Sequence, residues 1–226
     1  MATIVNGQVY TPGLAIVDAP QPNTPLGGDT LQVAIEISGN GKLPSSDSDT
    51  QFHEITLFLT SNHLSKNFTI SNGTSSNSNA YVGPVLDLEP TSTVKHVDWT
   101  WPACLVGDGD GDSDSPRGDY NISMHQSFRW NGSDYYTVFD LPIQVTNSIE
   151  ESDDRVECTL VENELLSPDV IAASNDTLSA HPWLSGNFST GKDSSKESET
   201  NQGSCAKTGV KGLVLLTMVV GSMLLT

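Results

Sequence analysis

The feature that most restricts the fold of this chain is an alternation of apolar and polar residues through residues 1–147. Successive side chains of a β-strand point to opposite faces of a sheet, so a period of two is typical of half-buried strands. Apolar spacing of the helical kind does not occur before residue 150. We therefore predict an all-β domain. The alternating runs are residues 31–37, 53–59, 97–101, 120–130 and 139–145.

The segments that join these runs are rich in turn residues. Asn131-Gly132 stands between two alternating runs and favours a tight hairpin, because both residues tolerate positive φ. Several short strands with such connections predict an antiparallel immunoglobulin-like β-sandwich. We assign it to residues 1–160, a length sufficient for a core of its own.

The composition changes after residue 147. Residues 149–200 contain twelve acidic and three basic side chains, and beyond residue 175 there is too little apolar area to offset the entropy of ordering. We predict an acidic, Ser/Thr-rich, disordered stalk over residues 161–203. The whole chain has a net charge of −18, which excludes a general nucleic-acid binder because ten basic groups cannot form a phosphate-binding stripe.

The last fifteen residues, 212–226, are uncharged and follow a short polar spacer that is preceded by small residues. This order is typical of a signal for attachment of a glycosylphosphatidylinositol (GPI) lipid, and we assign the cleaved propeptide to residues 204–226. The alternative is a tail anchor, although fifteen helical residues span only about 22 Å. The candidate attachment residues are Asn201, Gly203 and Ser204.

A GPI protein enters the secretory pathway, yet residues 1–7 have neither the basic nor the apolar region of a signal peptide. We expect either a leader that precedes this sequence or a chain that is not exported. Six N-x-[ST] sequons, several of them in expected turns or on polar strand faces, favour export as a glycoprotein. The sequon residues are Asn67, Asn72, Asn121, Asn131, Asn175 and Asn187.

The three cysteines give a further argument for an oxidising compartment. Cleavage at the attachment site would remove Cys205 and leave an even pair. We predict a Cys104–Cys158 disulfide, which would close a loop of about 55 residues and stabilise the fold by roughly 4 kcal/mol. The alternative is two unrelated buried thiols.

An acidic loop over residues 108–119 carries carboxylates at alternate positions with glycines between them. Its Asp108, Asp110, Asp112 and Asp119 resemble a calcium loop, in which Asp119 is the twelfth residue. The sixth position is Ser113 rather than glycine, and no helices are expected on either side. A solvated acidic hairpin loop is the favoured interpretation.

No motif in the sequence indicates catalysis. The five histidines lack metal-ligand spacing, and no nucleophile elbow, phosphate loop or dinucleotide motif is present. His53, His96 and His125 lie near expected strand faces, and their convergence would favour a metal site. Separate surface histidines are the favoured interpretation, so we predict no catalytic residue, no metal and no cofactor.

Trp99 and Trp101 share one face of an expected strand. A solvent-facing pair would form a sugar-stacking platform, but the neighbouring apolar Val97 on the same face favours packing in the core.

The order of these parts resembles that of small GPI-anchored surface proteins of filamentous fungi. Over about fifty residues, the runs Trp99-Thr-Trp101-Pro, Gly118-Asp-Tyr120-Asn-Ile and Phe139-Asp-Leu-Pro-Ile-Gln-Val resemble the Kre9/Knh1-type domain of fungal cell-wall proteins. The resemblance implies an immunoglobulin-like fold and a location at the wall, and it carries over no catalytic residue.

We therefore expect a non-enzymatic, GPI-anchored glycoprotein on the extracellular face of the plasma membrane or in the cell wall. Its role would be structural, adhesive or wall-associated, with the membrane lipid and a wall polysaccharide as expected partners. The alternative is a secreted enzyme or metal-dependent accessory protein that acts on wall polysaccharide.

Overall fold

The fold is described from a computed structural model, which covers residues 3–38, 49–74, 80–109, 115–164 and 189–191. Strands dominate this part of the chain, where helical structure is limited to three 3-10 turns. The prediction of an all-β domain is confirmed. Most of the predicted stalk and the whole predicted propeptide lie outside the described residues. The 3-10 turns are η1 (Val85–Asp87), η2 (Ala103–Leu105) and η3 (Cys158–Leu160).

One sheet holds five antiparallel strands. A tight turn at Asn6 and Gly7, with φ of 52° and 82°, joins its first two strands. The prediction missed this hairpin, although its Asn-Gly dipeptide is the same signal as the one at residues 131–132. In spatial order the strands are β1 (Thr3–Val5), β2 (Gln8–Tyr10), β3 (Ile16–Ala19), β5 (Thr30–Glu36) and β8 (Val94–Thr100).

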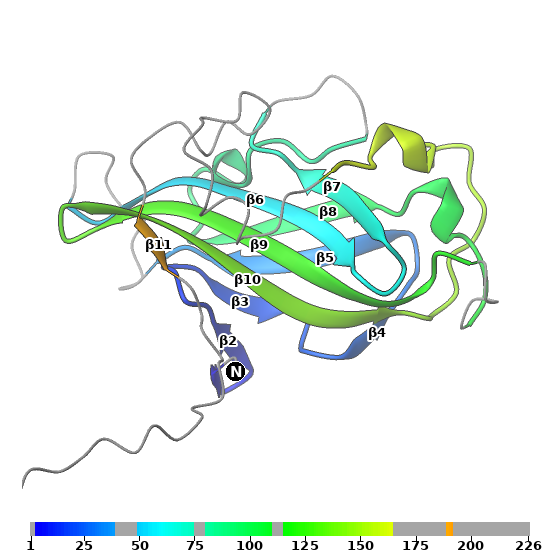
Figure 1. The fold of residues 1–226 in the computed structure, drawn as a ribbon, viewed down its shortest axis with the longest axis horizontal. Coiled ribbons are helices and arrows are strands. Elements are labelled where there is room, and N and C mark those ends of the chain that lie inside the picture. Colours follow the sequence, from blue (N-terminus) through cyan, green and yellow to red (C-terminus); the bar gives the residue numbers. More distant parts are fainter. Residues whose placement is uncertain (1–2, 39–48, 75–79, 110–114, 165–188, 192–226) are drawn as a thin grey trace, which may run out of the picture. The chain divides into compact units, whose positions relative to one another are not determined.

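The other sheet is built on a long hairpin of two strands, β9 (Gly118–Trp130) and β10 (Ser133–Val145). Asn131 and Gly132 form the turn with φ of 50° and 77°, which confirms the predicted hairpin. The sheet order is β11-β10-β9-β6-β7, and β4 also pairs with β10 (Figure 1). The remaining bounds are β4 (Thr24–Leu26), β6 (Gln51–Ser61), β7 (Lys66–Ser71) and β11 (Ser189–Gly191).

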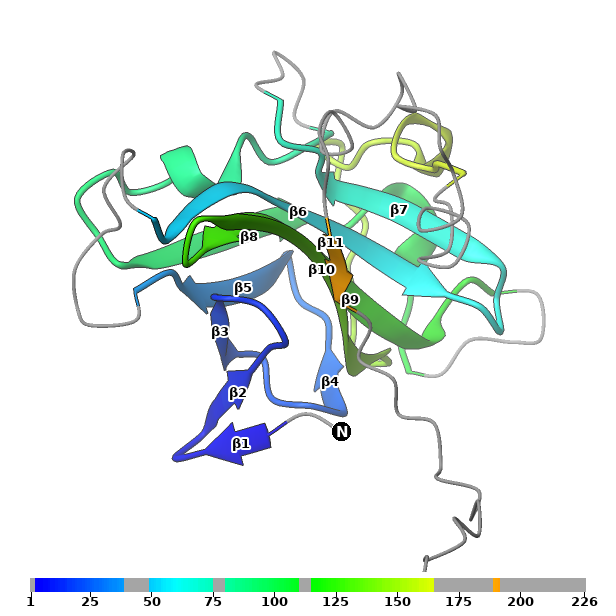
Figure 2. The same ribbon diagram turned by 60° about the vertical axis from the view of Figure 1, so that its left-hand side comes forward.

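The two sheets lie face to face in a sandwich-like arrangement, with β3, β5 and β8 against β6, β9 and β10 (Figures 1 and 2). Alternation directs one face of each sheet into a shared core, as predicted. Burial of these apolar side chains is the main source of stability. Core residues include Leu31, Val33 and Ile35 from the first sheet and Leu57, Ile122, Met124 and Leu141 from the second.

The second face of β9 differs from the prediction. In the alternating run 120–130, Ser123 and His125 occupy the positions opposite the apolar residues, which predicts that they face solvent. Both are instead buried, with exposed fractions of 4% and 2%. The aromatic rings of Phe58 on β6 and Tyr136 on β10 pack edge-on against His125, at centroid distances of 5.0 and 5.8 Å. β9 is therefore buried on both faces in its middle.

Candidate functional site

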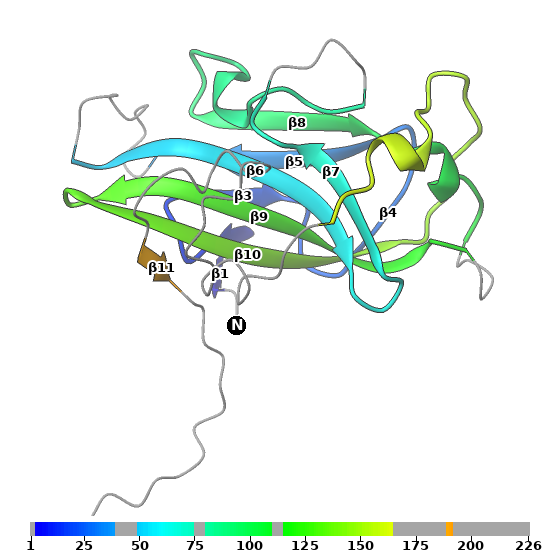
Figure 3. The same ribbon diagram turned by 45° about the horizontal axis from the view of Figure 1, so that its top comes forward.

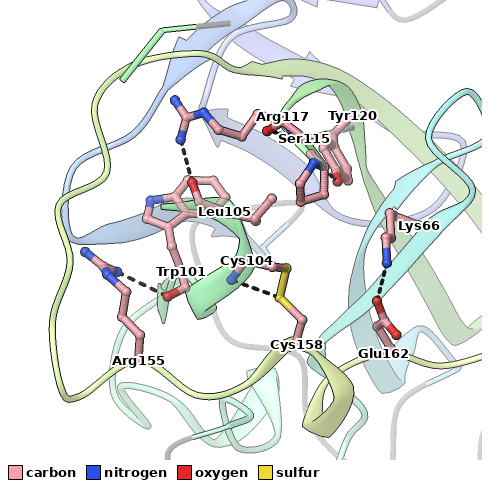
Figure 4. Close-up of a disulfide and its surroundings, with 11 residues drawn as sticks. Lys66, Trp101, Cys104, Leu105, Ser115, Arg117, Tyr120, Arg155, Cys158 and Glu162 are labelled. Atoms are coloured by element: carbon pink, nitrogen blue, oxygen red, sulfur yellow. Dashed lines mark hydrogen bonds and ion pairs between the residues drawn. A yellow bond between two sulfur atoms is a disulfide. The ribbon is translucent and has the colours of Figure 1, made fainter. Parts of the chain in front are cut away.

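The predicted disulfide is present between η2 and η3. The Cα atoms of Cys104 and Cys158 are 5.9 Å apart, and 54 positions separate the two residues in the sequence (Figure 4). The bond fastens the segment that follows β10 to the end of the sandwich. Beyond the bond, Val161 and Asn163 exchange backbone hydrogen bonds with β7, where η3 lies beside that strand (Figure 3).

Two buried arginines hold the loops around this disulfide. The guanidinium of Arg155 donates to the carbonyl oxygens of Glu150 (2.7 Å), Trp101 (3.1 Å) and Asp29 (3.2 Å). The guanidinium of Arg117 donates to the carbonyl oxygen of Leu105 in η2 (Figure 4), and also to those of Gly109 in its own loop (3.0 Å) and of Asn147 after β10 (2.6 Å). Each charged group therefore replaces its water shell with several hydrogen bonds, as burial of a charge requires.

The acidic loop is only partly described. Asp110 and Asp112 lie outside the described residues, so the calcium interpretation is not tested. Asp108 is exposed, and the exposed Asp119 accepts a hydrogen bond from Gln144 at 3.1 Å. The last turn of the loop is held by Arg117, whose side chain is buried.

The four sequons within the described residues differ in accessibility. Asn67, Asn72 and Asn121 are half-buried, whereas Asn131 is exposed at the tip of the β9–β10 hairpin. The hydroxyl residues of two sequons are buried: Thr69 Oγ1 accepts from Asn163 at 2.9 Å, and Ser123 Oγ donates to Asp140 at 2.6 Å. Ser133, in the sequon of Asn131, is exposed. Asn175, Asn187, Asn201, Gly203 and Ser204 lie outside the described residues.

The end of the β9–β10 hairpin is fixed on one face by a charged cluster. Arg129 forms two parallel hydrogen bonds with Asp134 across the strand pair, at 2.8 and 3.0 Å. His53 Nε2 lies 3.0 Å from the same carboxylate. The hydrogen bonds from Arg129 have the largest effect on the pKa of Asp134, followed by the contact with His53. Together they lower this pKa to about 2.

The other face of the hairpin end is aromatic. Phe128 and Tyr135 face each other across the strand pair, with stacked rings whose centroids are 5.7 Å apart. Alternation places Trp130 on the same face, two residues farther toward the tip. Its side chain is 53% exposed, the largest exposure of any described tryptophan.

The three histidines named as a possible metal group have separate partners. His53 contacts Asp134, His96 contacts Glu89 at 3.0 Å, and His125 contacts Tyr136. Within the described residues no group of three or more His, Cys, Asp or Glu side chains is placed to hold a metal ion. The backbone N–H of His96 also donates to Glu89, and this bond lowers the pKa of the Glu89 carboxyl.

A chain of polar groups crosses the buried outer face of β9 and β10. Ser123 Oγ donates to Asp140, lies 3.4 Å from His125 Nε2, and the opposite ring nitrogen of His125 bonds to the Tyr136 hydroxyl. The serine proton is directed at the carboxylate rather than at the imidazole. This order is unlike that of a nucleophilic triad, in which the histidine accepts the serine proton.

Trp99 and Trp101 are both packed in the core, as predicted. Their exposed fractions are 1% and 0%, and the two rings meet edge to face at a centroid distance of 6.0 Å. Each indole N–H finds a carbonyl oxygen, that of Ala80 at 3.0 Å and that of Gly27 at 3.3 Å. Neither ring is available for stacking with a sugar.

Comparisons with known proteins add no assignment. No family model, curated protein or solved structure matches this chain. Among the described residues, no helix is both long and apolar enough to cross a membrane.

Trp130 was not among the site residues predicted from the sequence. The sequence nevertheless contained a signal for its exposure. An aromatic residue directly before an Asn-Gly turn is the last residue of its strand and lies at the tip of the hairpin, where the facing sheet does not have to bury it. The buried polar chain at His125 was also missed, because alternation alone does not tell whether a polar face is covered.

Proposed function

We propose that this chain is a non-enzymatic, GPI-anchored cell-surface glycoprotein whose β-sandwich has a structural, adhesive or wall-associated role. The observation that carries the proposal is the Cys104–Cys158 disulfide. Disulfides of this structural kind persist in oxidising compartments and are rare in the cytosol. The bond also uses both cysteines that would remain after cleavage of the propeptide.

The local geometry supports an immunoglobulin-like form of the sandwich and, with it, the proposed relation to the Kre9/Knh1-type wall proteins. The hydroxyl of Tyr120, near the start of β9, bonds to the carbonyl oxygen of Pro116 four residues earlier. A tyrosine corner of this kind is a hallmark of such folds. Burial raises the pKa of the Tyr120 hydroxyl, so it remains a donor at any physiological pH.

The surface chemistry fits an exported glycoprotein. Asn131 and Ser133 form an accessible sequon on an ordered hairpin. The net charge of −18 favours a hydrated, soluble domain at a surface. The alternative, a metal-dependent accessory protein, has less support, because the three strand histidines each contact a different partner.

Release by a phosphatidylinositol-specific phospholipase tests the anchor. On intact cells that display the full chain, we expect the enzyme to release it, because only the lipid would hold it to the membrane. A protein with a transmembrane helix should stay, and a known GPI protein should leave. Val219→Arg, which interrupts the apolar run 212–226, should abolish the releasable surface form. Retention of the wild-type chain while the GPI control leaves would contradict the proposal.

A further inference from the structure

We propose that Trp130 is the docking surface for the first N-acetylglucosamine of a glycan on Asn131. This inference rests on the proposed function, since the glycan is added only in the secretory pathway. It goes further by naming one sequon, one sugar and the side chain that receives it.

The exposure of Trp130 needs an explanation. Tryptophan is usually well buried, yet this side chain is 53% exposed at the tip of a hairpin, while Trp99 and Trp101 are almost fully buried. An indole left in water forfeits the free energy that its burial would contribute. A covering group at this position would recover part of it.

The hairpin holds Trp130 in a fixed place. On the face opposite the ring, Arg129 and Asp134 are joined by two hydrogen bonds. The turn is tied to the rest of the domain, because the N–H of Gly132 donates to the carbonyl oxygen of Asp49 at 3.0 Å. The ring is therefore displayed on an ordered element, which lowers the entropic cost of binding against it.

Asn131 brings its sugar to the ring without a diffusional search. The two residues are consecutive, so their Cα atoms are about 3.8 Å apart, and Asn131 is exposed in the tight turn. A sugar joined to the Asn131 amide is present at a very high effective concentration beside the indole. This covalent link favours the attached glycan over a free polysaccharide or a second copy of the chain.

The chemistry of the pair is complementary. The face of an indole carries partial negative charge, and the axial C–H groups of a pyranose ring carry partial positive charge. A sugar laid over the ring buries apolar area while its hydroxyl groups stay in water. N-acetylglucosamine adds an acetamido methyl group to the same contact.

A second aromatic-Asn pair in the chain serves as a comparison. Tyr120 directly precedes the sequon residue Asn121, but it is 2% exposed and its hydroxyl is bonded to the carbonyl oxygen of Pro116. No ring is available there to receive a sugar. A glycan at Asn121 should therefore show none of the effects expected at Asn131.

The test uses the full chain, expressed in a eukaryotic cell behind an added leader and then purified. Ser133→Ala removes the sequon without changing Asn131, whose positive φ a substitution would strain, and Ser133→Thr keeps the sequon. Occupancy is read by glycopeptide mass spectrometry, and exposure of the ring by acrylamide quenching of fluorescence. Subtracting the signal of Trp130→Ala removes the contribution of the other tryptophans.

We expect Asn131 to be glycosylated in the wild type and in Ser133→Thr. In the wild type, the quenching constant of Trp130 should be roughly half its value in the Ser133→Ala variant, since a sugar covers one of the two ring faces. Loss of the glycan should lower the Tm by about 2–4 °C. In the Trp130→Ala background the Ser133→Ala change should leave the Tm unaltered. Trimming to a single N-acetylglucosamine should preserve the protection.

The outcomes separate this inference from the proposed function. If other sequons carry glycans but Asn131 is bare, or if Asn131 is glycosylated and Trp130 is quenched as readily as in Ser133→Ala, only the docking inference is wrong. A chain that carries no glycan at any sequon would overturn the glycoprotein proposal itself.

Discussion

At the scale of single residues, Lys95 is a charged side chain that lies in the buried interior of the domain. It extends from β8 into the interior, opposite Ile35, and is 1% exposed. Its ammonium donates to the carbonyl oxygen of Glu89 at 2.9 Å. Burial lowers the pKa of Lys95, and the negative charges of Glu89 and Asp87 act in the opposite direction.

Replacement of Lys95 by methionine should stabilise the domain. The variant keeps most of the side-chain volume and removes a buried charge, which we expect to raise the free energy of unfolding by about 1–2 kcal/mol at pH 7. The carbonyl oxygen of Glu89 would keep the N–H of Ser92 as a donor, at 2.8 Å. Urea denaturation of the two proteins measures the difference.

The difference in the free energy of unfolding between the wild type and Lys95→Met should also depend on pH, and the direction of the pKa shift gives its sign. The pKa of Lys95 is lower in the folded state than in the unfolded one, so the unfolded state binds more protons in the window below pH 10.5. Stability of the wild type should therefore rise with pH in that window, and the advantage of Lys95→Met should shrink. Lys95→Ala, which leaves a cavity, should be destabilised instead. A Lys95→Met variant less stable than the wild type at pH 7 would contradict this account.

Lys95 and Gln126 also show what the sequence could not predict at this scale. Both are polar residues at inward positions of strands that were otherwise assigned correctly. Gln126 accepts a hydrogen bond from the N–H of Ala15, 111 residues away. Alternation identifies the inward face, but partners so distant in the sequence are specified only by the folded chain.

At the scale of elements, the segment from 146 to 164 has little regular structure, yet it is held firmly. Arg155 joins it to the loops at Trp101 and Asp29, and Cys158 joins it to η2. Its end pairs with β7 through Val161 and Asn163. The pairing of Cys104 with Cys158 was predicted because cleavage of the proposed propeptide would remove the third cysteine, Cys205. The arginine contacts were not, because their acceptors are backbone carbonyl oxygens, which carry no sequence signal.

Removal of the disulfide should destabilise the sandwich substantially. For a loop closed over 54 positions, the chain-entropy model gives a loss of about 4 kcal/mol in the double variant Cys104→Ser/Cys158→Ser. The reason is the larger conformational freedom of the unfolded chain. Urea denaturation, with the reduced wild type as a matched sample, measures the loss. A loss of less than 1 kcal/mol would contradict this prediction and show that the other contacts of this segment hold it in place without the disulfide.

The hairpin of β9 and β10 was the element best predicted from the sequence. The Asn-Gly turn at residues 131–132 and the alternation on both sides determined its register. In contrast, the short strands β1, β3 and β4 contain too few residues for a period of two to be recognised. β3 and β4 pair with the longer strands β5 and β10, whereas β1 pairs with the equally short β2.

At the scale of the whole molecule, the chain forms a disulfide-linked β-sandwich, which we propose is located outside the cytosol. The described residues supply the disulfide and an exposed sequon. The sequence supplies the uncharged end at residues 212–226. An acidic surface, a glycan and a lipid anchor are mutually consistent, because each suits a domain displayed at a hydrated surface.

The most direct test of this central claim is intact and peptide mass spectrometry of the protein purified from its natural source. The account predicts a C-terminus at Asn201, Gly203 or Ser204 that carries the GPI linkage. It also predicts an oxidised Cys104–Cys158 pair and at least one glycosylated asparagine. A product that retains residues 212–226, with free thiols and unmodified sequons, would contradict it.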